Sequence, residues 1–246
     1  MYRYFINICL LWVLASGIGL AQQTGAPQPE KTVEPTAPQK KLKEPFHWEI
    51  NSVGLGVDLA PLVLTSLNDQ VTRYEAYTDL LLSRTWLVSA AYGRHQTQRA
   101  DRAQTFDYES KGSYLRFGID YNFLRKASKT DMITLGLRYA HATFDHAGTS
   151  LIDSSYWGGG ELHTQVNGVS ANIVELAGGI QVNLFRHFYL GSSFRFMILA
   201  SVSDSPTLNV ADIPEYGPRK EGNSTRMGYN FFVMYRLPIG PRKPGN

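Results

Sequence analysis

Apolar residues occupy every second position in eight segments of the chain, and glycine, small, polar or charged residues lie between them. The last segment is the clearest, with an apolar side chain at each odd position from Met227 to Leu237. Successive side chains of a strand point to opposite faces, so each segment predicts a β-strand with one apolar and one polar face. The eight predicted strands cover residues 47–60, 73–82, 86–93, 113–122, 132–140, 171–185, 188–199 and 227–238.

The connections between these strands alternate in length. Long connections cover 61–72, 94–112, 141–170 and 200–226, and short ones cover 83–85, 123–131 and 186–187. All prolines lie outside the strand interiors, and no charged residue falls on the apolar side between the first and last apolar residues of any strand. This pattern is typical of barrels whose apolar face touches lipid. It predicts an all-β fold, an eight-stranded antiparallel transmembrane up-and-down β-barrel.

The first 45 residues differ from the rest. Arg3 precedes an apolar stretch that ends in small residues at Gly19 and Ala21, which predicts a signal peptide over residues 1–21. Residues 22–45 are rich in Pro, Gln, Thr, Lys and Glu, and they predict a disordered periplasmic linker. The barrel is assigned to residues 46–240 and a basic tail to 241–246. Short turns mark the periplasmic side of such barrels, so we expect a bacterial outer-membrane location with both termini in the periplasm.

Composition excludes several functions. The single cysteine, Cys9, lies in the predicted signal peptide, so the mature chain has no thiol for disulfides, nucleophilic catalysis or metal binding. The formal charge is only +3, and no basic stripe with interleaved aromatic residues suggests a nucleic-acid partner.

We single out nine charged residues on the polar side of the predicted strands. They are Asp58, Glu75, Asp79, Arg116, Asp120, Arg138, Glu175, Arg195 and Arg236. Inside a narrow barrel they must pair, because isolated buried charges are costly. We interpret them as an ion-pair network that closes the barrel, and the alternative is a gate or a path for protons or ions. Glycines on the same side, such as Gly93 and Gly118, are expected to make room for arginine side chains.

Candidate catalytic and metal-binding residues lie in or beside the predicted loops. They are His95, His141, Asp145, His146 and His163, with Ser150, Asp153, Ser154 and Ser155 nearby. No G-x-S-x-G motif and no His-x-Ser arrangement on a C-terminal strand accompanies them, so no catalytic residue is predicted. Asp145, His146 and His163 have metal-binding chemistry but no diagnostic spacing, and neither a metal nor a cofactor is expected. For the loop residues Tyr156–Gly160, surface recognition and a tucked aromatic with a flexible turn remain alternatives.

Several motifs resemble those of an uncharacterised outer-membrane β-barrel family of Bacteroidota. They include G-L-G-V-D-L-A-P-L at 54–62, G-S-Y-L-R-F-G-I-D-Y-N-F-L at 112–124, D-M-I-T-L-G-L-R-Y at 131–139 and Y-W-G-G at 156–159. The similarity covers nearly everything after the linker. Because the function of that domain is unknown, the resemblance implies the fold and the location but no functional residues. One departure is the basic tail after Leu237, since many such barrels end in an aromatic residue.

The pattern therefore predicts a small non-enzymatic barrel of the OmpX or OmpA type, with mobile extracellular loops and a structural or surface-interaction role, and not a wide pore. Its expected partners are outer-membrane lipid, lipopolysaccharide, the barrel-assembly machinery during insertion and an unknown extracellular ligand. One alternative is an outer-membrane lipid-modifying enzyme, like a lipid A deacylase or acyltransferase, that uses loop histidines. Another is a soluble lipocalin-like barrel whose apolar side chains surround a ligand.

Overall fold

A computed structural model describes residues 49–61, 70–100, 106–128, 130–152, 158–203, 208–220 and 222–239. All of them belong to one compact unit, Phe46–Asn246. The predicted signal peptide, linker and basic tail lie outside the described residues, as do Asp153–Trp157, so these predictions stay untested. No helix among the described residues is long and apolar enough to cross a membrane.

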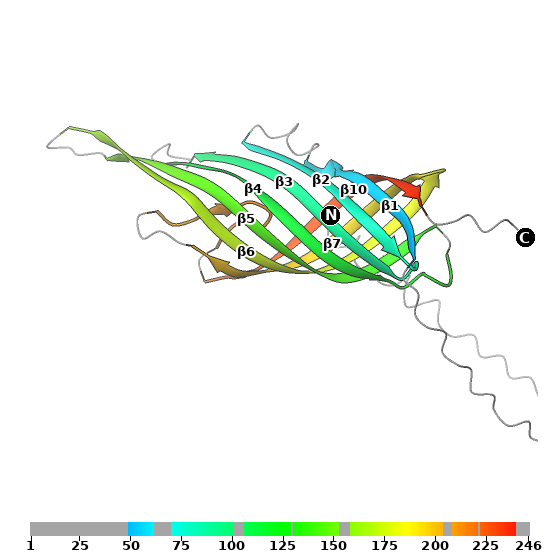
Figure 1. Cartoon of the computed structure of the whole chain (residues 1–246). Coiled ribbons are helices and arrows are strands. Elements are labelled where there is room, and N and C mark those ends of the chain that lie inside the picture. Colours follow the sequence, from blue (N-terminus) through cyan, green and yellow to red (C-terminus); the bar gives the residue numbers. More distant parts are fainter. Residues whose placement is uncertain are drawn as a thin grey trace, which may run out of the picture. The chain divides into compact units, whose positions relative to one another are not determined.

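Eight antiparallel strands form a closed barrel in which neighbours along the chain are neighbours in space (Figure 1). They are β1 (Ile50–Asp58), β2 (Val71–Leu82), β3 (Trp86–Ala100), β4 (Phe106–Asn122), β5 (Met132–Ile152), β6 (Gly160–Phe185), β7 (Phe188–Val202) and β10 (Thr225–Pro238). The predicted eight-stranded antiparallel up-and-down barrel is confirmed. We call its two ends the short-turn end, where β1 begins and β10 finishes, and the long-loop end.

The apolar side of the strands faces outward. Leu137 is 60% exposed, whereas Glu175 on the opposite face is fully buried. The lipocalin-like alternative requires the opposite arrangement, so it is wrong. We define the outer belt as the exposed apolar residues Leu55, Val57, Tyr74, Leu80, Val88, Tyr92, Leu115, Phe117, Ile119, Ile133, Leu135, Leu137, Tyr139, Val174, Leu176, Ile180, Val182, Leu184, Phe188, Leu190, Phe194, Ile198, Met227, Tyr229, Phe231, Tyr235 and Leu237.

Strands β3 to β6 are much longer than predicted, and β5 and β6 reach furthest beyond the rest of the barrel (Figure 1). Ladder pairing continues as far as Ala100–Asp107 and Ile152–Gly160. The prediction that 94–112 and 141–170 are mobile loops is therefore wrong for most of their length. The reason is a change of side: beyond about residue 140 of β5, the buried inward positions become apolar and the outward ones become polar.

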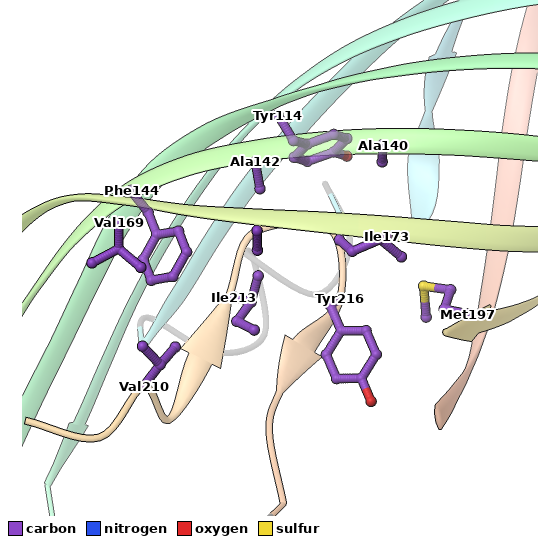
Figure 2. Packing of buried hydrophobic residues seen from close by; sticks show 11 residues of the cluster. Tyr114, Ala140, Ala142, Phe144, Val169, Ile173, Met197, Val210, Ile213 and Tyr216 are labelled. Carbon is purple, nitrogen blue, oxygen red and sulfur yellow. The ribbon is translucent and has the colours of Figure 1, made fainter. Parts of the chain in front are cut away.

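A two-stranded hairpin lies within the connection from β7 to β10. It consists of β8 (Asp212–Ile213) and β9 (Gly217–Pro218). The hairpin contributes Val210, Ile213 and Tyr216 to a buried cluster on the inner face of the long strands (Figure 2). The other members are Tyr114, Ala140, Ala142, Phe144, Val169, Ala171, Ile173 and Met197. This cluster is the apolar core of the barrel, and it fixes the hairpin inside the long-loop end.

The ladders differ in length around the ring. The seam between β1 and β10 contains seven residue pairs, from Ser52–Pro238 to Asp58–Phe232. The ladder between β5 and β6 contains twenty, from Met132–Gln181 to Ile152–Gly160. The ring is thus closed by one of its shortest ladders.

Candidate functional site: the charged barrel interior

The nine charged residues singled out in the sequence point to the inside of the barrel. Eight of them are buried, and Arg138 is half-buried with 14% of its side chain exposed. They come from every strand of the ring except β3. Because alternate residues of a strand share one face, the ladder register stacks these side chains in layers across the barrel.

The layer nearest the short-turn end contains two ion pairs. Arg236 donates from Nη2 to Asp79 Oδ2 at 2.8 Å, and both side chains are almost fully buried. Arg138 Nη2 lies 3.2 Å from Asp120 Oδ2. The Arg236 guanidinium also donates to Gln181 Oε1 at 3.1 Å and lies over a tyrosine ring. Each buried charge in this layer therefore has an opposite charge beside it, as the desolvation cost demands.

A second layer lies closer to the long-loop end. Arg116 donates to Glu75, which also accepts a hydrogen bond from the Tyr114 hydroxyl. Arg195 pairs with Glu175 at 3.6 Å, and both side chains are buried. The Arg116–Glu75 contact joins β4 and β2, which are not ladder neighbours, whereas Arg195 and Glu175 lie on the neighbouring strands β7 and β6.

The hairpin adds two carboxylates that the sequence pattern did not reveal. Glu215 accepts hydrogen bonds from Arg116 and Arg195, and it pairs with Arg73 Nη2 at 2.8 Å. Arg73 has the same strand parity as Glu75, so the alternation could have identified it. Glu215 lies in a connection without periodicity, so no sequence signal marks it.

The second hairpin carboxylate, Asp212, has a separate set of partners. His95 Nε2 lies 2.8 Å from Asp212 Oδ1, and Arg99 Nη2 donates to Oδ2 at 2.7 Å. Burial in the neighbouring apolar cluster raises the pKa of the Tyr216 hydroxyl above its ordinary value. The hairpin is therefore held by ion pairs on one side and by apolar contacts on the other.

A small cavity lies between the two layers. The cavity there has a volume of about 40 Å³ and is lined by Glu75, Asp79, Arg116 and Arg138 among others. At about 10–15 Å³ for each water, it has room for about three water molecules. Larger cavities of about 220 Å³ and 310 Å³ lie at the short-turn and long-loop ends. Paired side chains thus constrict the middle of the barrel.

Interior glycines make room for side chains on the neighbouring strand, and some of these side chains are rings. A Cβ atom on Gly118 would lie 2.5 Å from Arg138 Cγ, as expected from the sequence. At three other positions the neighbour is aromatic: Gly56 faces Tyr77, Gly93 faces Tyr114, and Gly191 faces Phe232. The expectation of arginine neighbours is therefore wrong at these three, where glycine lets a ring lie flat across the ladder.

The candidate histidines are on strands and not in loops, because β3, β5 and β6 continue beyond their predicted ends. His141 Nδ1 lies 2.8 Å from Asn172 Oδ1, and His163 Nδ1 lies 2.6 Å from Thr149 Oγ1. His95 has the carboxylate of Asp212 as its partner. Each of the three histidines therefore has a different partner: an amide oxygen for His141, a hydroxyl for His163 and a carboxylate for His95. These contacts assemble no catalytic triad.

The metal site considered from the sequence is not formed. Asp145 is exposed on the outer face of β5, whereas His146 is buried on the inner face between the rings of Tyr108 and Phe144. Adjacent strand residues point to opposite sides, so the two side chains do not converge. No group of three or more His, Cys, Asp or Glu residues in the described part of the chain is placed to hold a metal ion.

Three solved structures are similar at low identity. They are Ail, the attachment invasion locus protein of Yersinia pestis (12% identity, 76% of this chain, 97% of that chain, TM-score 0.36), CarO2 of Acinetobacter baumannii (8%, 78%, 100%, 0.41) and a major outer membrane protein from Thermus thermophilus (10%, 76%, 98%, 0.41). Likenesses this distant carry no argument about activity or location.

Comparison at the sequence level gives a family without an activity. No curated protein matches the chain. An origin in Bacteroidota, which the motifs suggested, stays a prediction. A family model described as "Domain of unknown function (DUF6048)" matches residues 1–242. The match covers nearly the whole chain, which therefore belongs to this domain family of unknown function.

Proposed function

We propose that the chain is a small, non-enzymatic integral protein of the bacterial outer membrane, with a closed bore and a structural or surface-interaction role. The observation that carries this proposal is the combination of an exposed apolar belt outside with paired, buried charges inside. A protein that folds in water buries its apolar side chains, and an outer-membrane barrel exposes them to hydrocarbon.

The dimensions of the outer belt fit a bilayer. On β10 the belt runs from Met227 to Leu237, ten residue steps, or about 33 Å at about 3.3 Å per residue. At a strand tilt of about 40°, this corresponds to about 25 Å along the membrane normal, the usual height of the apolar band. Aromatic rings meet at the short-turn edge, where Trp86 contacts Tyr121 and Tyr121 contacts Phe123. Such rings form the interfacial girdles of these barrels.

The proposed orientation places the short-turn end in the periplasm. It rests on the predicted signal peptide, on the short turns and on the polar outer faces of β3 to β6 beyond the belt. Exposed Lys111, Glu109 and Asp145 lie on these outer faces. In this orientation they meet lipopolysaccharide headgroups or the medium, and the barrel-assembly machinery inserts the strands. The surface-interaction role then belongs to the long-loop end.

A matched pair of variants tests the membrane location. Leu137→Arg places a charge in the middle of the outer belt and is expected to destabilise the inserted barrel by about 2–4 kcal/mol. Thr143→Arg lies on the same face of β5 but beyond the belt, and it should change stability by less than about 1 kcal/mol. Urea unfolding from lipid vesicles measures both. Equal tolerance of the two variants, together with solubility without detergent, contradicts an integral location.

Closure and orientation need separate measurements. The reconstituted protein should give no steady ion current across a planar bilayer, and a steady current contradicts the closed bore. The mature chain has no native cysteine if residues 1–21 are removed, so single cysteines report orientation. A membrane-impermeant maleimide added to intact cells should label Glu161→Cys at the long-loop end but not Lys126→Cys at the short-turn end. The reverse labelling pattern refutes the orientation.

A further inference from the structure

Three arginines from three strands converge on one carboxylate in the long-loop end. Arg73 of β2 contacts one oxygen of Glu215, and Arg116 of β4 and Arg195 of β7 contact the other. Guanidinium groups recognise carboxylates through charge-assisted hydrogen bonds of this kind. The barrel wall thus supplies all the donors, and the carboxylate comes from a hairpin inserted between the strands.

Glu215 is in an unfavourable backbone conformation. Its φ is +72°, in the left-handed region that residues other than glycine, asparagine and aspartate rarely adopt. Such a residue persists only where its surroundings hold it there. The carboxylate contacts of Glu215 hold it there together with the buried side chains of Ile213 and Tyr216, so the arginine cluster helps to offset the strain of the hairpin tip.

Without Glu215, the three guanidinium groups lose an acceptor that all three share. Glu75 and Glu175 remain paired with these arginines, and Asp58 lies near Arg73 and Arg195. Arg195 is 2% exposed, and its Nε has no hydrogen-bond partner among the described residues. Removal of Glu215 therefore takes a shared acceptor from the cluster, and Arg195 retains an unused donor.

A cavity of about 310 Å³ adjoins the arginine cluster. Its lining includes four arginines, Arg73, Arg99, Arg195 and Arg226. It also includes the carboxylates of Glu215, Asp58 and Asp212, of which Asp212 is paired with Arg99. This volume is at the lower end of the range for small-molecule sites. A ligand with one carboxylate could thus place that group among the three arginines and the rest of its structure in the cavity.

We propose that Arg73, Arg116 and Arg195 form a binding site for the carboxylate group of a small acidic molecule, and that Glu215 occupies this site as an internal ligand. Binding of the external carboxylate then displaces the hairpin tip. This site goes beyond the closed-bore function and does not depend on it. Its failure in the test below leaves the membrane location and the closed bore untouched.

Chemical rescue by acetate tests the site. Glu215→Gly removes the carboxylate and also relieves the backbone strain, so its loss of thermal stability reports the unfilled arginine cluster. Sodium acetate should raise the Tm of this variant in a saturable manner, with a half-maximal effect in the millimolar range, and sodium chloride at equal ionic strength should not. Equal responses to acetate and chloride overturn the proposal.

Two controls make the rescue specific. Glu109→Gly removes an exposed carboxylate on β4, and its Tm should not respond to acetate differently from chloride. Adding Arg73→Gln to Glu215→Gly should abolish the acetate response. If acetate still stabilises the double variant as strongly as the single one, the three arginines are not the site.

The wild-type chain gives a second measurement if Glu215→Gly does not fold. A tethered group such as Glu215 has an effective concentration of order millimolar, so acetate well above that level competes with it. Trypsin cleavage after Arg219, next to β9, should then become several-fold faster in acetate than in chloride. An unchanged cleavage rate overturns displacement of the hairpin by a carboxylate.

Discussion

The ion pair between Arg236 and Asp79 allows the charged interior to be tested by a double-mutant cycle. The two side chains are 2.8 Å apart, with 4% and 2% of their surfaces exposed. Arg236→Met and Asp79→Asn each leave one buried charge without its partner, and the double variant removes both charges. If pairing is what makes these charges tolerable, the loss of stability in the double variant must be smaller than the sum of the two single losses.

The expected magnitudes follow from the contacts that each variant loses. Removing one member of a buried pair costs about 3–5 kcal/mol, or roughly two to three and a half powers of ten in the folding equilibrium. Arg236→Met should be near the upper value, because Arg236 also donates to Gln181 and Ser52, each bond worth about 1 kcal/mol. Asp79→Asn should be near the lower value, since those two acceptors still hold the arginine. The double variant should lose clearly less than the sum.

Equilibrium urea unfolding in lipid vesicles, followed by tryptophan fluorescence, measures all three free energies of unfolding. Arg94→Met is the matched control, because Arg94 is exposed on the outer face of β3 and its loss should cost less than about 0.5 kcal/mol. Two results would refute the reasoning. One is a loss below about 1 kcal/mol in both single variants, and the other is a double variant whose loss equals the sum of the singles.

Three further predictions concern the hairpin and the glycines. Ile213→Ala should weaken hairpin docking by about 2–5 kcal/mol, because the side chain is fully buried; hydrogen exchange should accelerate in the hairpin alone, and unchanged exchange contradicts this. Gly93→Ala should destabilise the barrel by about 1–3 kcal/mol, since its Cβ would lie 2.3 Å from the Tyr114 ring, whereas Gly160→Ala, with open space around it, should be neutral in the same urea titration. Deleting residues 208–220 should not create a conducting pore, because both layers of ion pairs remain; a steady bilayer current in that variant shows that the hairpin alone closes the bore.

Alternation predicted the eight strands because one physical rule governs both faces of the belt. Residues that touch hydrocarbon must be apolar, and their neighbours must be small or paired charges. The same rule led to underestimated strand lengths. On β5, Tyr139 is the last outward residue of the belt, and from Ala140 to Phe144 the apolar residues are on the inward side. A search for continuous alternation on one side stops at this inversion.

The hairpin could not be predicted for a different reason. Its strands have two residues each, too few for a periodic signal, and Pro214 and Pro218 suggest an irregular loop. Its position depends on contacts with β4 to β6 that are about 40 to 100 residues away in the chain. The partners of Glu215 follow from barrel closure and register, and these are set by three-dimensional packing. The sequence could therefore assign the charged residues to the barrel interior, but it could not show which of them form ion pairs.

The seam between β1 and β10 has a consequence for how the ring is assembled and how it comes apart. These are the first and last strands, so no turn joins them, and their ladder has seven pairs where β5 and β6 have twenty. Parting the seam uncovers about one third as many backbone groups, and in hydrocarbon each unsatisfied group costs several kcal/mol. We therefore expect β1 and β10 to pair last when the barrel forms and to separate first when it unfolds. A molecule that leaves the barrel interior sideways into the bilayer should pass between β1 and β10.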